Sequence, residues 1–279
     1  MKNLSRILVP FACAMLASCR PPKVGVVGPA GFAQPRYGYQ LSYRDPGQKQ
    51  FVGPEWQLDN YYVDPHWSKL QPKKGPDYIA VREFDADNDG AISPMEKQEE
   101  PIYDLRFVNS KDDGVIWVKA HPVARAEAHR DLDVVLDNYA DGLAGTGLYA
   151  QGNLFNVQRT KLRQFTTFLT SKEPIKLGAL QALSGTIELA EVEKLRLDPQ
   201  YRSEKIKVVF ARFMYFEPAS RNFDPVDGAP IVTHNGESCY QRSALLIAGY
   251  ANSVPRFDGH LKDFEQVLNQ FVFAADSAP

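Results

Sequence analysis

The sequence has no large excess of charge of either sign. Its 279 residues include 32 Lys and Arg against 34 Asp and Glu, for a formal net charge of −2. Proteins that bind the nucleic-acid backbone need a basic surface, so this balance argues against a nucleic-acid partner. It argues equally against electrostatic adhesion to anionic lipid. An apolar content of 44% is enough for a buried core.

Histidine is also scarce, and its spacing gives no support to a zinc enzyme. The five His residues form no HExxH motif and no i,i+4 pair. The chain contains no Gly-x-Ser-x-Gly that would mark a hydrolase nucleophile. Scattered carboxylates cannot be given acid and base roles without geometry. We therefore predict no catalytic residue and no organic cofactor.

The N-terminus lacks an apolar run long enough to span a bilayer. A short basic region ends at Arg6, and an apolar run interrupted by Pro10 follows up to Ala17. This pattern predicts a secretory signal peptide over residues 1–18. The sequence of residues 16–19, Leu-Ala-Ser-Cys, resembles the bacterial lipobox. The resemblance implies a lipid on Cys19 and a protein anchored in the bacterial cell envelope; an ordinary signal peptide cut nearby is the alternative.

The residue after the lipobox and the other cysteines refine this prediction. In Gram-negative lipoproteins an Asp after the lipidated Cys is the usual inner-membrane retention signal, so Arg20 implies the outer membrane. With Cys13 in the signal peptide and Cys19 lipidated, Cys239 is alone in the mature chain, which excludes an intrachain disulfide. We expect Cys239 to be a half-buried structural residue, because no His or Asn arrangement nearby supports a nucleophile.

One stretch, residues 85–96, carries the clearest chemistry. Calcium prefers six to eight oxygen ligands, and a loop that wraps the ion needs carboxylates at alternating positions. Gly90 at position 6 allows the sharp bend that such a loop requires. The predicted ligands are Asp85, Asp87, Asp89, the carbonyl oxygen of Ala91, Ser93 and Glu96.

This stretch matches the pattern D-x-[DN]-x-[DN]-G-x5-E at every fixed position, and it resembles an EF-hand loop, with Ile92 at position 8. The resemblance implies one bound calcium ion. The alternative is an acidic surface turn without metal. We find no second loop to pair with it, because residues 137–142 and 224–227 both fail at position 3.

The residues around the loop suggest its structural context. Ser93, Pro94 and Glu96 fit a helix start, so we expect a short helix after the loop that Pro101 ends. Residues 78–84, before the loop, fit either a helical turn or a strand. The whole predicted EF-hand region covers residues 77–100.

Composition and periodicity predict the domain boundaries, strands and helices of the rest of the chain. Repeated Pro and Gly predict a flexible tether over residues 19–36, and folded structure is expected to begin near Tyr37. After the tether we predict one α+β domain over residues 37–273 and a tail over residues 274–279. Asp112 and Asp113 are expected to be turn residues of a hairpin, not ligands. Strands are predicted at residues 37–43, 56–63, 103–108, 115–119, 165–169, 175–177, 183–189, 206–216 and 240–250, and helices at 124–139 and 257–273.

The predicted fold class is an antiparallel sheet packed with helices, with the calcium loop inserted. Residues 206–216 are apolar on both faces and should lie centrally. The layout resembles the PsbP-like fold through an early Trp strand at residues 54–56, a Gly-x-x-Ala-like turn in residues 177–182, and the chain end from 245 to 264. Members of that family are mainly binding or assembly factors without a shared active site, so no functional residue transfers.

Two functional hypotheses follow. The first is a non-enzymatic, lipid-anchored calcium-binding protein of the envelope. The second is an envelope enzyme with a structural calcium ion and an active site within residues 224–240. A pocket that brought together His234, Glu237 and Cys239 would favour the second hypothesis.

Overall fold

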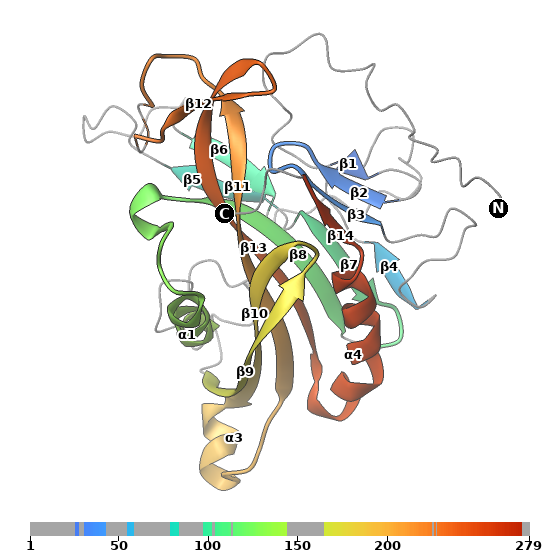
Figure 1. The fold of residues 1–279 in the computed structure, drawn as a ribbon. Helices are drawn as coiled ribbons and strands as arrows, with labels where there is room; N and C mark the ends of the chain where they lie inside the picture. Colours follow the sequence, from blue (N-terminus) through green and yellow to red (C-terminus); the bar gives the residue numbers. More distant parts are fainter. Residues whose placement is uncertain are drawn as a thin grey trace, which may run out of the picture.

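A large antiparallel sheet forms the centre of the protein (Figure 1). The computed structural model describes residues 26–27, 31–42, 55–58, 79–83, 97–101, 104–112, 114–143, 165–224, 226 and 228–274. The strand order is β4-β7-β8-β13-β11-β10-β9, and β12 pairs with β13 outside this path. The strands are β4 (Trp56–Leu58), β7 (Leu105–Asn109), β8 (Val115–Val123), β9 (Phe165–Leu177), β10 (Leu180–Glu191), β11 (Glu204–Pro218), β12 (Ile231–His234) and β13 (Glu237–Ser253).

The long strands β11 and β13 pair along their full length at the centre of this sheet, from Glu204 opposite Ser253 to Pro218 opposite Cys239. Both faces of β11 are buried, because Val209 and Phe213 belong to one core cluster and Phe210 belongs to the other. The predicted central position of residues 206–216 is therefore confirmed.

One face of the sheet is covered by helix α4 (Val254–Leu268) and a four-stranded sheet. That small sheet has the order β1-β2-β3-β14 and is formed by β1 (Val26–Val27), β2 (Gly31–Gln34), β3 (Tyr39–Ser42) and β14 (Phe271–Phe273). Tyr39, Phe257 and Phe264 from this layer lie in one core cluster with Phe213 of β11. Burial of aromatic side chains is the main force that holds the two layers together.

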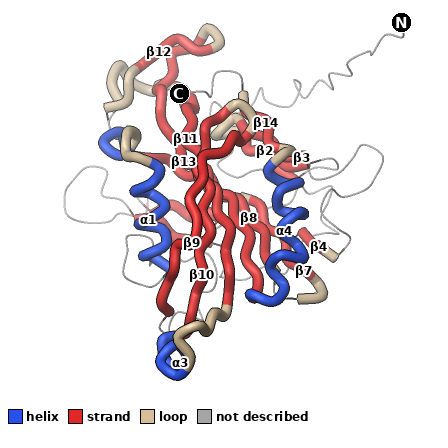
Figure 2. Tube along the Cα trace, turned by 60° about the horizontal axis from the view of Figure 1, so that its bottom comes forward, coloured by secondary structure: helices blue, strands red, loops and turns tan. Residues whose placement is uncertain are grey.

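The opposite face is covered by helix α1 (Leu132–Leu143), so α1 and α4 lie on either side of the sheet (Figure 2). Leu136 of α1 packs so closely on β10 that a Cβ atom at Gly185 would lie 2.6 Å from its side chain. The 3-10 helix η4 (Arg125–Glu127) precedes α1, and a short helix α3 (Val192–Leu197) connects β10 to β11. The predicted helix at 124–139 is thus two helices, with the second one extending further.

A buried carboxylate links the two sheets. Asp104, with 4% of its surface exposed, accepts hydrogen bonds from the Tyr39 hydroxyl at 2.8 Å, the Gln34 side-chain amide at 3.2 Å and the Ala120 backbone N–H at 2.7 Å. Burial and the charge of Asp104 raise the pKa of Tyr39 well above its usual value. These bonds fix the position of β2 and β3 on the central sheet.

A separate two-stranded ribbon is formed by β5 (Ile79–Glu83) and β6 (Lys97–Pro101). Its antiparallel register runs from Ile79 opposite Pro101 to Glu83 opposite Lys97. The segment before the predicted calcium loop is therefore a strand over 79–83, and the prediction of a helix up to Pro101 is wrong over 97–101. Cross-strand pairing overrides a local helix-start signal here, and a Pro at the end of a ribbon is compatible with a strand.

Three further expectations need correction. Folded structure begins before Tyr37, because β2 pairs with β3 and buries Phe32, so the tether does not reach residue 36. The final helix ends at Leu268, because residues 271–273 instead pair with β3 as strand β14. Strand β12 forms between the predicted strands 206–216 and 240–250, where no strand was expected. The fold class itself, an antiparallel sheet packed with helices, is confirmed.

Candidate functional site

The predicted calcium loop is described only through its flanks. Asp85, Asp87, Asp89, Ala91, Ser93 and Glu96 lie outside the described residues, as does Cys19. The ribbon places Glu83 directly opposite Lys97. Residues directly opposite each other in an antiparallel pair have Cα atoms about 5 Å apart. The chain therefore leaves β5 and enters β6 at neighbouring points, with the whole predicted ligand set between them.

The hairpin of β12 and β13 holds the residues of the predicted alternative active site. Its turn is Asn235-Gly236, and both residues have positive φ, 51° and 82°. His234 stacks flat on Phe216, with ring centroids 3.9 Å apart. Its Nε2 atom lies 3.0 Å from the side-chain amide of Asn235. The imidazole is thus engaged with an aromatic ring and an amide.

Cys239 is buried in β13, with 5% of its surface exposed. Burial raises the pKa of its thiol, and the charge of Glu237 raises it further. A nucleophilic cysteine needs the opposite shift, because the thiolate is the reactive form. Cys239 is more deeply buried than the half-buried position expected from the sequence, and its surroundings are compatible with the predicted structural role.

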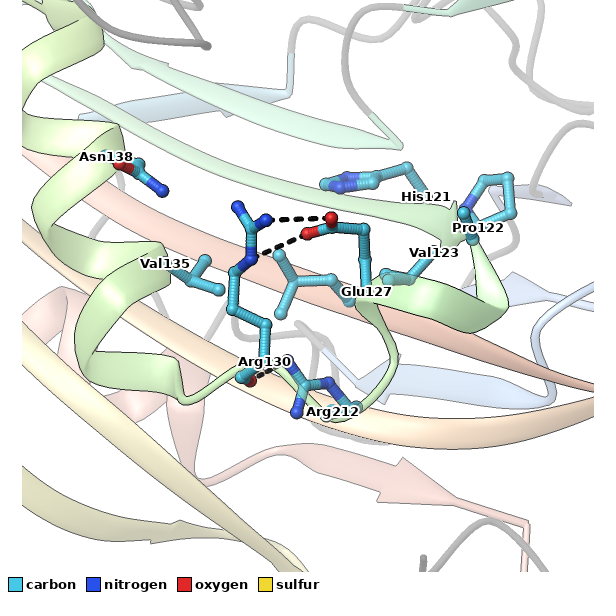
Figure 3. A pocket seen from close by; sticks show the side chains of 10 residues that line it. His121, Pro122, Val123, Glu127, Arg130, Val135, Asn138 and Arg212 are labelled. Carbon is cyan, nitrogen blue, oxygen red and sulfur yellow. Dashed lines mark hydrogen bonds and ion pairs between the residues drawn. The ribbon is translucent and has the colours of Figure 1, made fainter.

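A pocket lies elsewhere, between the end of β8, η4 and α1 (Figure 3). Its volume is about 180 Å³, which is below the range of about 300 to 1,000 Å³ typical of ligand sites. Arg130 points into it but forms two short contacts with Glu127, at 2.7 and 2.8 Å. Arg212 donates to the carbonyl oxygen of Arg130. The charge of Arg130 is therefore already matched within the pocket wall.

A second group of side chains meets at the other face of the sheet. His260 and Asp263 lie one turn apart on α4, Glu55 immediately precedes β4, and Asp112 lies in the turn between β7 and β8. Nδ1 of His260 lies 3.2 Å from Asp263 and 3.9 Å from Glu55, while Nε2 lies 3.5 Å from Asp112. Three carboxylates thus surround one imidazole.

Sequence reasoning missed this group. Asp112 was expected to be a turn residue, and it is one, since its Oδ1 accepts the backbone N–H of Gly114 at 2.8 Å. Its second oxygen, however, faces His260. Residues 55, 112 and 260 are far apart in the chain, and only the i,i+3 spacing of His260 and Asp263 hinted that two of the donors share a helix face.

No family model and no curated protein matches the chain. Among solved structures, the chain is similar to the solution structure of cyanobacterial PsbP (CyanoP) from Synechocystis sp. PCC 6803. The identity is 11%, the match covers 93% of this chain and 99% of that chain, and the TM-score is 0.43. At this identity and TM-score the likeness carries no argument about fold family, activity, ligand or location.

Proposed function

We propose that this protein is a lipid-anchored, calcium-binding protein of the bacterial cell envelope, with one calcium ion in the loop of residues 85–96 and a non-enzymatic binding or structural role. The observation that carries the proposal is the β5–β6 ribbon. A twelve-residue calcium loop needs its first and last ligands at the same ion. The pairing of Glu83 with Lys97 holds the ends of the segment together, which is what Asp85 and Glu96 require.

The ribbon also changes the kind of calcium site that we propose. An EF-hand holds its loop between two helices, whereas the described flanks here are strands. The site is then a single loop closed by a ribbon, without the paired helices through which calcium sensors open a groove. We expect a dissociation constant of about 10⁻⁴ to 10⁻³ M, as in extracellular calcium modules.

The carboxylates of the loop give a reason for bound calcium to stabilise the folded protein. Asp85, Asp87, Asp89 and Glu96 place four carboxylates within residues 85–96. Like charges this close repel one another, and a divalent cation between them removes the repulsion. Calcium should therefore stabilise the ribbon and with it the folded protein.

The anchor is supported by the lipobox-like sequence that ends at Cys19 and by the small net charge of −2, which leaves an acyl chain as the membrane contact. In the described part of the chain no helix combines the length and the apolar character needed to cross a membrane. Mass spectrometry of the N-terminal peptide from the native envelope should find Cys19 as the first residue and acylated. An unmodified Cys19 within a longer peptide would contradict the anchor.

The non-enzymatic role is supported by the β12–β13 hairpin. Cys239 is buried with a raised thiol pKa, and the ring of His234 is stacked on Phe216. These two side chains would have to act together in the alternative active site. Their environments suit packing better than nucleophilic chemistry.

Thermal unfolding with and without calcium tests the proposal. A ligand that binds only the folded state stabilises it, by about 1.4 to 2.7 kcal/mol at about 10 mM calcium for the affinity given above. For a chain of this size the melting temperature should rise by about 3 to 8 °C. Asp85→Ala and Glu96→Gln should abolish the rise, whereas the exposed control Glu193→Gln should keep it. The same rise in all the variants would refute binding at this loop.

A further inference from the structure

The group around His260 has the composition of a metal site. Glu55, His260 and Asp263 each offer one ligand atom, and the three atoms all lie within 4.8 Å of one another. Metal–ligand bonds of about 2.0 to 2.2 Å place two ligands of one ion at most about 4.3 Å apart. The separations from Nδ1 of His260, 3.2 and 3.9 Å, are already in this range. Small side-chain movements would complete the site.

The fourth side chain, Asp112, faces the second nitrogen of the imidazole. Its Oδ2 lies 3.5 Å from Nε2 of His260, and Oδ2 of Asp263 lies 3.2 Å from Nδ1. A metal ion bound at Nδ1 would select the tautomer with its proton on Nε2, toward Asp112. A neutral imidazole with its proton on Nε2 presents the Nδ1 lone pair to Glu55 and Asp263. A lone pair that faces two carboxylates is unfavourable unless a cation lies between them. This carboxylate–histidine arrangement is the one that orients histidines in metal sites.

Among the residues that the structure describes, no basic side chain other than His260 lies beside the carboxylates of this group. Within the described part of the chain, no Lys or Arg forms an ion pair with Glu55, Asp112 or Asp263. Other partly buried carboxylates are treated differently: Glu217 and Asp224 both pair with Arg242, at 2.9 and 2.7 Å. A bound divalent cation would supply the missing positive charge.

The donors are also held in place by neighbouring residues. The indole N–H of Trp56 donates to Oδ2 of Asp263 at 2.8 Å, and the ring of Trp56 meets His260 edge-on at 5.6 Å. The side-chain amide of Asn252 donates to Oδ2 of Asp112 at 3.1 Å. These contacts come from β4, β13 and α4, so rigid elements position the donors before any ion binds.

From these observations we propose that Glu55, His260 and Asp263 bind a first-row divalent transition metal ion, such as zinc, with Asp112 orienting the imidazole. One nitrogen and two carboxylate donors suit such ions, whereas calcium prefers oxygen ligands alone. The side chains of Glu55, His260 and Asp263 are 18%, 22% and 20% exposed. A further coordination position is therefore open to water or to a ligand. This site is distinct from the loop of residues 85–96.

Zinc titration of the full chain by calorimetry tests this proposal, in excess calcium so that the calcium loop is already filled. Binding of one zinc ion is expected. His260→Gln and Asp263→Asn should weaken it by at least about 100-fold, and Asp112→Asn by about 10- to 100-fold, the usual loss for an orienting partner. The exposed controls His129→Gln and Glu265→Gln, and Asp85→Ala in the calcium loop, should bind zinc like the parent.

Cobalt absorption gives a second readout, because d–d bands in the visible range report ligand type and geometry. The parent should give bands that are lost in His260→Gln, while far-UV circular dichroism of that variant stays unchanged. Absence of zinc binding at millimolar concentration would overturn the proposal. Zinc binding that survives His260→Gln and Asp263→Asn would overturn it as well.

Discussion

At the scale of single residues, the surroundings of a side chain in the folded protein decide its chemistry. Cys239 is buried on β13 near Glu237, and both burial and that charge raise its thiol pKa. His234 has an aromatic ring against its face. Neither condition can be inferred from the spacing of these residues in the chain, because each depends on strands that meet only in the folded protein.

The thiol of Cys239 should therefore react slowly with alkylating reagents. A chain that begins at Arg20 has Cys239 as its single cysteine. A raised pKa lowers the thiolate fraction at pH 8.5, so alkylation by iodoacetamide should be more than about tenfold slower than for the same chain in urea. The rate should rise with pH above 8.5 without levelling off near the ordinary thiol pKa. Equal rates in the folded and unfolded chains would show that Cys239 is an accessible thiol.

At the scale of elements, close packing limits which residues the core accepts. Gly249 of β13 lies opposite Trp117 of β8, and a Cβ atom on Gly249 would lie 2.0 Å from the indole ring. Gly259 of α4 has no atom within 4 Å of the corresponding position. The two glycines thus form a matched pair, one required by packing and one not.

Gly249→Ala should lower the free energy of unfolding by about 1 to 3 kcal/mol, because the added methyl group forces the Trp117 ring to move. Gly259→Ala should raise it by up to about 1 kcal/mol, because Ala favours a helix over Gly. Urea denaturation of both variants measures the difference. A stabilised Gly249→Ala protein would mean that Trp117 does not lie across this glycine.

Much of the element order was predictable, and the failures have a common cause. Apolar periodicity located the strand at 206–216, and the Asp-Gly turn residues located the hairpin before β8. Both are local signals in the sequence. The segments 31–34, 97–101 and 271–273 form short strands only because a partner strand lies beside them. Segment 271–273 pairs with β3, far away in the chain, whereas 31–34 and 97–101 pair with the neighbouring strands β3 and β5. Each of the three strands depends on its partner, so the sequence pattern predicted a tether, a helix and the end of a helix instead.

At the scale of the whole molecule, the central sheet carries a helical layer on each face, and Asp104 links it to the small sheet. The layered α+β class followed from the alternation of predicted strands and helices. The group of Glu55, Asp112, His260 and Asp263 could not be predicted, because the register of β4, the β7–β8 turn and the placement of α4 bring it together. The proposed calcium loop is the opposite case, since its predicted ligands all lie within residues 85–96.

Calorimetric titration of calcium into the chain from Arg20 tests the central claim most directly. We predict one calcium ion per chain, with a dissociation constant of about 10⁻⁴ to 10⁻³ M. Binding should be lost in Asp85→Ala and in Glu96→Gln, and retained in Glu193→Gln. No heat of binding at millimolar calcium, or equal binding in the parent and in both loop variants, would contradict the proposal that residues 85–96 form a calcium site.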